Sequence, residues 1–522
     1  MSNEKPSMAL FWGCFIALIT TAFAFITRAF LVNDPSLWPA AFGLDGVQSK
    51  VLFGHGIWPF AISIIVFSLV IDKIGYRIAM IFSFVCYCLY AILALVAYSK
   101  INPGGEPLTG EALKTAQASA YNFLVAGSII LGLGNGTVEA FINPVVATMF
   151  NKDKTKWLNI LHAGWPGGLV IGGLITLALG SQVADDWRVL VYMIALPAIV
   201  YLVMLIKVQF PVNERVASGT SYREMLAEFG IIGAVIAFGL VFMQLEQIFK
   251  FGSWFPIAGI AVSVIAYGAY CKSLGRPLLI FLCLIMMPLA TTELGTDEAI
   301  TGLMSAPLQE AGFNGLWVLI YTSAIMCGLR FFAGPIIQKF GPLGLLSICA
   351  SLAVAGLFWL SVAQGLVIIF SAATLYAIGK TFFWPTMLGV VAEQFPKGGA
   401  LTLNAIAGIG MLTVGIVGGP WIGAQTAKTT QAEIEEAIPG VYESISKTDK
   451  YILGSYEAVD AEKLKALPEE EAHKIEAVAK PAEQKALARI AVLPIFMLIA
   501  FLALVFYFKS KGGYKPVQVA DH

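Results

Sequence analysis

Long, nearly uninterrupted apolar runs constrain this chain more than any other feature of its sequence. The first extends from Met8 to Val32, and thirteen more follow it. About 20 apolar residues in a helix cross the hydrocarbon core of a bilayer, and helices satisfy their backbone polar groups internally. Hydrophobic residues make up 58% of the 522 residues and charged ones only 13%, against roughly 25% charged in soluble domains. The sequence therefore predicts an all-α, polytopic membrane protein.

The runs predict fourteen spans in a 6 + 2 + 6 arrangement. Residues 1–210 form a first six-helix bundle, 211–276 a cytoplasmic linker with two extra spans, and 277–522 a second six-helix bundle. The predicted spans are 8–32, 51–71, 78–98, 121–150, 157–179, 187–206, 230–249, 254–270, 277–292, 316–337, 343–363, 366–391, 401–422 and 490–508. The charged segment 424–489 is expected to be a long external loop with short amphipathic helices.

Basic residues set the predicted topology. Lys and Arg recur in alternate connections, whereas the connection 293–313 holds four acids and no base. By the positive-inside rule both termini face the cytoplasm, and we expect an integral protein of the plasma membrane, the inner membrane of a bacterium. The formal net charge is zero, which argues against nucleic acid as a partner.

The two six-helix blocks repeat one another. At an offset of 245 residues, Gly134 matches Gly379, Val146 matches Val391 and Asn159 matches Asn404 without a gap. A second correspondence joins the short segments 72–77 and 338–343, both with a Gly at the fourth position. A duplicated half with a binding site between the copies is the architecture of many secondary transporters.

Glu139 is the most unusual residue of the apolar runs. Apolar sequence surrounds it for about ten residues on each side, and a charge at such a depth costs roughly 2.5–3.5 kcal/mol on insertion scales. Asn135, Glu139 and Asn143 are spaced four apart, so they share one helix face, which we expect to line a cavity rather than lipid. Lys380 lies at the repeat position of Asn135, and Trp384 at that of Glu139.

The segment Asp72-Lys73-Ile-Gly75-Tyr-Arg77 resembles the helix 2–3 signature of the major facilitator superfamily. The resemblance implies that superfamily's fold, two six-helix bundles, here with an extra helix pair between them. It also implies a cytoplasmic latch, in which Asp72 pairs with a neighbouring helix end and with Arg77. In the superfamily the first and fourth helices of each half line the cavity, which would place Arg28, Glu139 and Lys380 around one chamber.

A narrower resemblance is to the fucose:proton symporter family of sugar transporters. Its fourth helix carries Glu-x-x-x-Asn-Pro, here Glu139, Asn143 and Pro144, and its fifth begins with a Leu-Asn pair, here Leu158-Asn159. The resemblance implies proton coupling at Glu139. Two features differ from the family: Val32 stands where its helix 1 acid would be, and that family has twelve spans.

We expect deprotonated Glu139 to pair with Arg28 or Lys380, and protonation to free the base for substrate. The alternative is a static ion pair that locks helices together. His55 and His162 are either packing histidines or cavity ligands. Trp58, Trp165 and Trp384 either stack on a sugar or serve as packing and interface anchors. The glycine series 164, 168, 172 and 415, 419, 423 are interpreted as close helix contacts.

The sequence contains no HExxH, GxSxG or P-loop pattern and no clustered metal ligands, so we expect no enzyme activity, cofactor or metal. The leading hypothesis is a secondary active transporter, a proton-coupled symporter of a sugar or similar small polar solute working by alternating access. Its partners would be the solute, protons and the lipid bilayer, and it would act as a monomer. The alternatives are a fourteen-span proton-coupled drug or metabolite exporter and an uncoupled facilitator.

Overall fold

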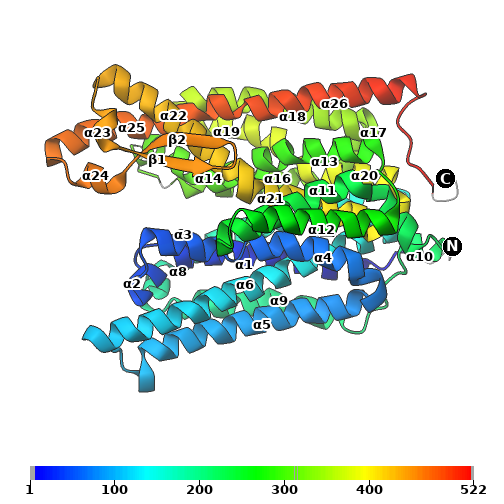
Figure 1. Ribbon diagram of the computed structural model, residues 1–522, viewed down its shortest axis with the longest axis horizontal. Coiled ribbons are helices and arrows are strands. Elements are labelled where there is room, and N and C mark those ends of the chain that lie inside the picture. The colour runs from blue at the N-terminus through cyan, green and yellow to red at the C-terminus, as the bar shows by residue number, and fades with distance from the viewer. Residues whose placement is uncertain (1–5, 311, 314, 519–522) are drawn as a thin grey trace. The chain divides into compact units, whose positions relative to one another are not determined.

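The computed structural model describes residues 6–310, 312–313 and 315–518, and they are overwhelmingly helical (Figure 1). The chain divides into two compact units. The first comprises residues up to Leu282 together with Leu388–Leu412 and the tail from Lys515, and the second comprises Cys283–Met387 and Thr413–Tyr514. The two extra helices of the predicted segment 211–276 belong to the first of these units, and the division into bundles at residues 210 and 276 stays a prediction.

The helices up to residue 282 are α1 (Met8–Asn33), α2 (Trp38–Phe42), α3 (Gly46–Gly54), α4 (Trp58–Ile74), α5 (Tyr76–Ile101), the 3-10 turn Pro103–Gly105, α6 (Gly110–Met149), α7 (Lys154–His162), α8 (Gly164–Asp185), α9 (Arg188–Leu205), α10 (Glu214–Ala217), α11 (Tyr222–Phe249), α12 (Trp254–Cys271) and α13 (Pro277–Ala290), which continues into the second unit.

The remaining elements are the π-helical turn Thr291–Gly295, α14 (Thr296–Leu303), α15 (Ser305–Gln309), α16 (Leu316–Phe331), α17 (Ala333–Phe340), α18 (Pro342–Val362), α19 (Leu366–Lys380), α20 (Phe383–Gln394), the 3-10 turn Pro396–Gly398, α21 (Gly399–Thr413), the π-helical turn Val414–Gly418, α22 (Gly419–Ala437), α23 (Tyr442–Ile445), β1 (Ser446–Tyr451), β2 (Gly454–Val459), α24 (Ala461–Lys465), α25 (Glu469–Ile490) and α26 (Val492–Ser510).

Thirteen helices of the described chain are long and apolar enough to cross a membrane. A fourteenth span is the pair α16 and α17, which together pass the same test but are bent by 71°. The fourteen predicted spans therefore all correspond to helices. The predicted end of the ninth span at residue 292 is wrong, because the helical segment continues to Leu303. Glu293, Asp297 and Glu298 thus belong to the span rather than to an external connection.

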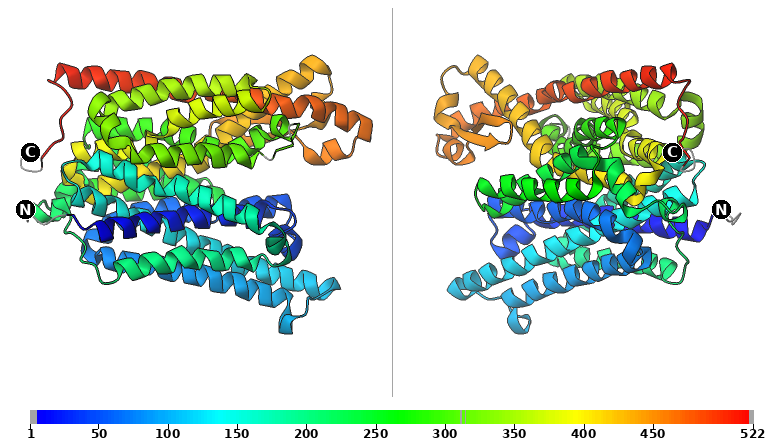
Figure 2. Two further views of the ribbon diagram at one scale, coloured as in Figure 1. Left: turned by 180° about the vertical axis from the view of Figure 1, so that it is seen from behind. Right: turned by 45° about the vertical axis from the view of Figure 1, so that its right-hand side comes forward.

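Glycines allow close helix packing in the first unit. A Cβ on Gly168 of α8 would stand 2.7 Å from the Cβ of Ala22 and 2.8 Å from the carbonyl oxygen of Ile19, both in α1. A Cβ on Gly136 of α6 would overlap Ser63 of α4. The predicted close packing through Gly164, Gly168 and Gly172 is confirmed, since all three face α1. In Figures 1 and 2, α5 and α6 run side by side along their lengths.

The repeat is visible in the turns that follow two corresponding helices. α4 ends at Ile74 and α5 begins at Tyr76, with Gly75 between them at φ 86°. α17 ends at Phe340 and α18 begins at Pro342, with Gly341 at φ 68°. Only glycine adopts this left-handed region without strain, so both turns require it.

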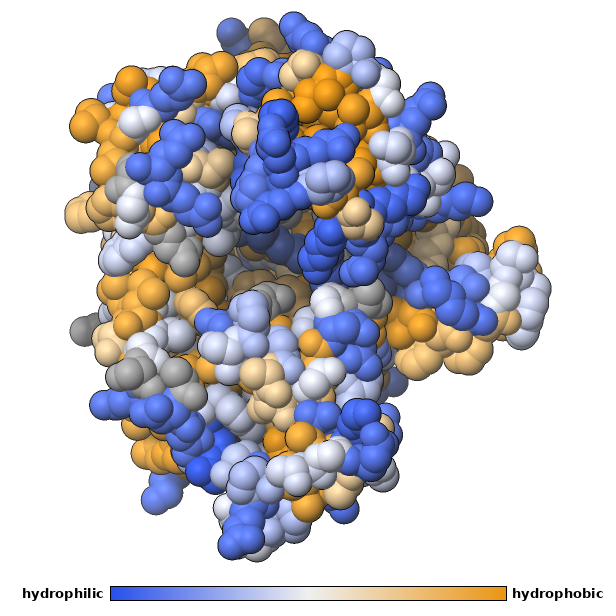
Figure 3. Space-filling model, turned by 90° about the vertical axis from the view of Figure 1, so that its left-hand side faces the viewer, coloured by the Kyte–Doolittle hydropathy of each residue, from blue (hydrophilic) through white to orange (hydrophobic). Residues whose placement is uncertain are grey.

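The segment 424–489, called the insertion from here on, is a small folded body rather than a loop of short helices. α22 continues through it to Ala437, β1 and β2 form an antiparallel hairpin with Tyr451 opposite Gly454, and α25 is 22 residues long. Its core is formed by the buried side chains Ile434, Tyr442, Ile445 and Ile475. Hydrophilic side chains gather over it in the upper part of Figure 3. The hairpin was not foreseen from the sequence.

Candidate functional site

A polar chain crosses the middle of the first unit from α6 to α7. Asn143 Nδ2 donates to Glu139 Oε2 at 2.8 Å, and His162 Nε2 lies 3.0 Å from Asn143 Oδ1. An amide oxygen only accepts, so this ring nitrogen is the donor. All three side chains are buried, Glu139 being 5% exposed. The four-residue spacing thus brings Glu139 and Asn143 together as predicted, and α7 adds His162.

The third residue of this α6 face, Asn135, has a different partner. Tyr87 of α5 donates its hydroxyl hydrogen to Asn135 Oδ1 at 2.9 Å, and the same hydroxyl lies 3.2 Å from Thr21 Oγ1 of α1. All three residues are buried. Helices α1, α5 and α6 are therefore joined by hydrogen bonds one turn before Glu139. Tyr87 was missed from the sequence because a tyrosine in an apolar run is ordinarily packing.

Arg28 does not pair with Glu139 in this structure. Its Nη1 donates to the carbonyl oxygens of Phe53 at 2.8 Å and Leu52 at 3.3 Å, in the last turn of α3, and its guanidinium carbon lies 4.7 Å from the Phe53 ring centroid. The last carbonyls of a helix have no intrahelical donor, so a buried cation satisfies them there. No Lys or Arg nitrogen of the described part of the first unit lies within 4 Å of the Glu139 carboxylate.

Three other predicted ligands of the first unit take packing positions. His55 Nδ1 lies 2.6 Å from the carbonyl oxygen of Val51 at the end of α3. Trp58 starts α4, and its ring packs against Phe249 with 5.9 Å between centroids. Trp165 packs between Phe25 of α1 and Phe60 of α4, with 5.7 and 6.3 Å between the ring centroids. Each of the three side chains therefore has a contact within the first unit, and the choice between packing and solute binding stays open.

The second unit holds two buried ion pairs that the sequence analysis did not propose. Lys380, fully buried at the end of α19, pairs with Asp297 of α14. Arg330 Nη2 of α16 donates to Glu293 Oε1 at 2.7 Å, and its Nε donates to the carbonyl oxygen of Thr381 at 2.7 Å. The backbone N–H of Trp384 donates to Glu293 Oε2 at 2.9 Å. Lys380 and Trp384 thus lie in one polar cluster with Glu293, Asp297 and Arg330.

A sequence signal for the missed acids exists. Glu293 and Asp297 are four residues apart, the same spacing as in Asn135, Glu139 and Asn143. α13 begins 269 residues after α1, and at this offset Asp297 corresponds to Arg28. The hydropathy criterion ended the span at residue 292 because three acids follow within six residues.

The predicted latch is built around Asp72, but Arg215 is its partner instead of Arg77. Arg215 Nη2 and Nε donate to Asp72 Oδ2 at 2.6 and 3.1 Å, and both side chains are buried. Arg77 Nη2 donates to the carbonyl oxygen of Val208 at 3.0 Å. Lys73 lies over the ring of Tyr222 at 4.7 Å. The motif therefore fastens the end of α4 and the start of α5 to the segment that follows α9, since Asp72 holds Arg215 of α10 and Arg77 holds Val208.

The long apolar helices, the internal repeat and the buried charges define a membrane transporter, and the sequence comparisons agree. Residues 9–420 match the family described as Major Facilitator Superfamily, so the chain belongs to that superfamily. It is a transporter and not an enzyme. No curated protein matches the sequence.

Solved structures share the fold at low identity. The proton:xylose symporter XylE bound to 6-bromo-6-deoxy-D-glucose is 15% identical, with a TM-score of 0.56, 95% of this chain covered and 98% of that one. A variant of the E. coli fucose:proton symporter FucP is 14% identical, with a TM-score of 0.52 and coverages of 92% and 98%. The human organic anion transporter MFSD10 is 13% identical, with a TM-score of 0.54 and coverages of 95% and 100%. At these identities the likeness concerns the fold.

Proposed function

We propose that this chain is a proton-coupled symporter of a sugar or similar small polar solute that works by alternating access in the plasma membrane, with Glu139 as the proton-carrying group. The observation that carries the proposal is the environment of Glu139. It is a buried carboxyl in an apolar span, and Asn143 is the one hydrogen-bond donor that the described structure gives it.

A neutral partner matters because a buried ion pair would fix the carboxyl in its charged form. An amide binds either form, since its N–H donates to a carboxylate and its oxygen accepts from a carboxylic acid. Glu139 therefore has no counter-ion among the described residues of its unit to oppose protonation. Asn143 also connects it to His162, a side chain that can carry a proton on either ring nitrogen. The sugar:proton symporters among the structures of similar fold support the same substrate class.

The test is uptake of labelled sugars into proteoliposomes with and without an imposed pH gradient. We expect the gradient to drive accumulation by the wild-type protein. Glu139→Gln should retain solute exchange at equal pH and lose gradient-driven accumulation. Glu111→Gln is the matched control, because Glu111 lies on the same helix with its side chain 87% exposed.

Three outcomes would overturn the proposal in whole or in part. Sugar uptake that ignores the gradient in the wild type would identify an uncoupled facilitator. Absence of sugar uptake, with outward movement of hydrophobic amines, would identify an exporter. Gradient-driven accumulation that survives in Glu139→Gln would remove Glu139 from the coupling mechanism.

A further inference from the structure

A cavity of about 730 Å³ lies within the second unit, between the span that ends at Leu303, the turn and helix 414–430, and the insertion. Its volume is that of a site for a small organic molecule, for which pockets run from roughly 300 to 1,000 Å³. Gly415, Gly419 and Gly423 line one wall. A Cβ on Gly419 would stand 3.3 Å from the carbonyl oxygen of Val414, and one on Gly423 would stand 3.7 Å from the hydroxyl oxygen of Tyr456.

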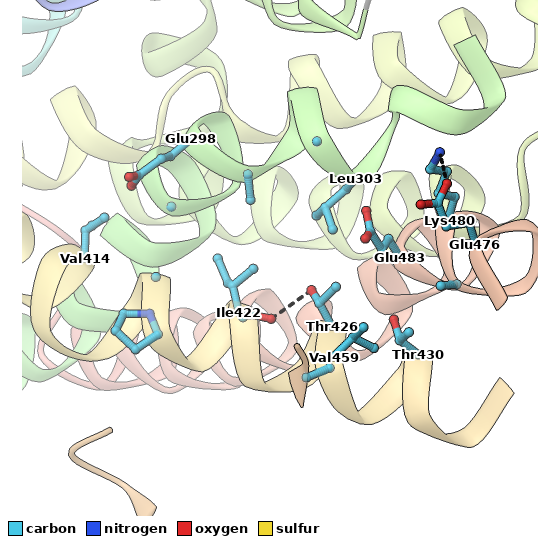
Figure 4. Close-up of a pocket in the computed structure, with 18 of the residues that line it drawn as sticks. Glu298, Leu303, Val414, Ile422, Thr426, Thr430, Val459, Glu476, Lys480 and Glu483 are labelled. Carbon is cyan, nitrogen blue, oxygen red and sulfur yellow. Dashed lines mark hydrogen bonds and ion pairs between the residues drawn. The ribbon is translucent and has the colours of Figure 1, made fainter. Parts of the chain in front are cut away.

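The charges of the cavity lie at its two ends. In Figure 4, Glu298 lies at one end, and Glu483 lies at the other beside Glu476 and Lys480. Lys480 Nζ pairs with Glu476 Oε2 at 3.0 Å, so those two charges offset one another. Neither Glu298 nor Glu483 has a basic nitrogen within 4 Å among the described residues. The four side chains together carry a net charge of −2.

The region between the two ends is largely apolar. Leu303 and Ile422 lie between them in Figure 4, and Val459 also lines the cavity. Among the described residues no group of three His, Cys, Asp or Glu side chains is placed to hold a metal ion. Glu476 and Glu483 are two helical turns apart, about 10 Å along α25, whereas Ca²⁺ needs ligand oxygens at about 2.3–2.6 Å. The cavity therefore does not suit a divalent metal.

We propose that this cavity binds an elongated organic dication, such as an α,ω-diamine, with one ammonium group at Glu298, the other at Glu483, and the hydrocarbon chain along the apolar wall. Two separated carboxylates that form no ion pair within 4 Å among the described residues complement two separated positive charges, and the intervening wall complements methylene groups. The insertion supplies one of the two anionic ends, so it is part of a binding site. The site is separate from Glu139, and the proposal does not depend on the transported solute.

Gly302 offers a variant that blocks the cavity without disturbing its surroundings. A Cβ at Gly302 would meet no atom within 4 Å, and this glycine lines the cavity from α14. Gly302 is the last but one residue of α14 and has no positive φ, so a leucine brings no backbone strain there. Gly302→Leu should therefore fill the cavity while leaving thermal stability close to that of the wild type.

The experiment is calorimetric titration of purified full-length protein with α,ω-diamines of four to twelve carbons, and with the neutral 1,8-octanediol. We expect binding of diamines, with one chain length preferred, and at least tenfold weaker binding of the diol. Glu298→Gln and Glu483→Gln should each weaken binding at least fivefold, and raised ionic strength should also weaken it. Glu471→Gln on the exposed part of α25 is the matched control and should bind as the wild type does.

Gly302→Leu should abolish binding, and Glu139→Gln should leave it unchanged, which separates this proposal from the proton-coupling one. The proposal is overturned if the diol binds as tightly as the diamines, or if a folded Glu298→Gln, Glu483→Gln double variant binds as the wild type does. It is also overturned if no diamine binds to the wild type at concentrations up to about 10 mM. A dissociation constant above that concentration corresponds to a binding free energy weaker than about 3 kcal/mol.

Discussion

The buried pair of Glu293 and Arg330 leads to a stability prediction that can be worked from the geometry. Their side chains are 3% and 1% exposed, and the guanidinium joins α16, α19 and the π-helical turn through Glu293 and the Thr381 carbonyl. Arg330→Met leaves Glu293 as a buried carboxylate that still accepts the hydrogen bond from the Trp384 N–H. Removing one partner of a buried ion pair costs about 3–5 kcal/mol, so we expect the free energy of unfolding to fall by that amount.

The double variant Arg330→Met, Glu293→Gln tests the cause. A neutral amide still accepts from the Trp384 N–H and leaves no charge in the apolar interior. We therefore expect it to recover at least about 2 kcal/mol of the loss, because the cost of a buried unpaired charge disappears. Arg188→Met is the control, since the Arg188–Asp186 pair is about one-third exposed and such pairs contribute about 0–1 kcal/mol.

The assay is unfolding in mixed detergent micelles, followed by tryptophan fluorescence and compared at equal protein concentration. A single variant as stable as the wild type would refute the pairing. A double variant whose loss equals the sum of the two single losses would show that the charges do not interact. Either result would contradict a contribution of this ion pair to the stability of the second unit.

Three further predictions concern other parts of the chain. Gly168→Val should lower the free energy of unfolding by about 1–3 kcal/mol, because its side chain would overlap α1 at Ala22; unchanged unfolding would contradict the packing. Asp72→Asn should release the linker around Arg215, seen as faster amide hydrogen exchange there, with Glu111→Gln as the control. The hydrogen bonds from Arg188 lower the pKa of Asp186 in the folded protein below its ordinary value of about 3.9. The ionised Asp186 therefore contributes to the free energy of unfolding at neutral pH, and this contribution is lost as the pH falls through the lowered folded-state pKa. The difference in free energy of unfolding between wild type and Asp186→Asn, within about 1 kcal/mol at pH 7, should therefore shrink steadily as the pH is lowered below about 3.9.

The architecture could be predicted because its signal is strong and local. A bilayer allows long apolar segments few alternatives to helices, so the fourteen runs correspond to helices in the structure. The ends of the spans were harder, because hydropathy counts a charge as a boundary wherever it occurs. Glu293 and Asp297 lie inside the span since Arg330 and Lys380 neutralise them, and those bases are 37 and 83 residues away in the sequence.

Contacts of the candidate site were predictable from the sequence only where both residues lie on the same helix. Glu139 and Asn143 meet because they are four residues apart on α6. The partners of Arg28 and Asp72 come from other elements, so composition and spacing do not specify them. Arg28 binds the end of α3, 25 residues away in the sequence, and Asp72 binds Arg215, 143 residues away. The hairpin of the insertion was missed because a charged segment rich in Ala, Glu and Lys favours helix by propensity.

The repeat places opposite charges on corresponding helices of the two halves. In the first half, the base Arg28 is on α1 and the acid Glu139 on α6; in the second, the acid Asp297 is on α14 and the base Lys380 on α19. The acid and base of the second half form an ion pair, whereas Arg28 of the first half donates to backbone carbonyls. Glu139 is therefore the member of this set that is held by a neutral amide, and its protonation breaks no ion pair among the described residues of its unit. That difference, rather than the presence of a buried acid, is the physical reason to assign the proton to Glu139.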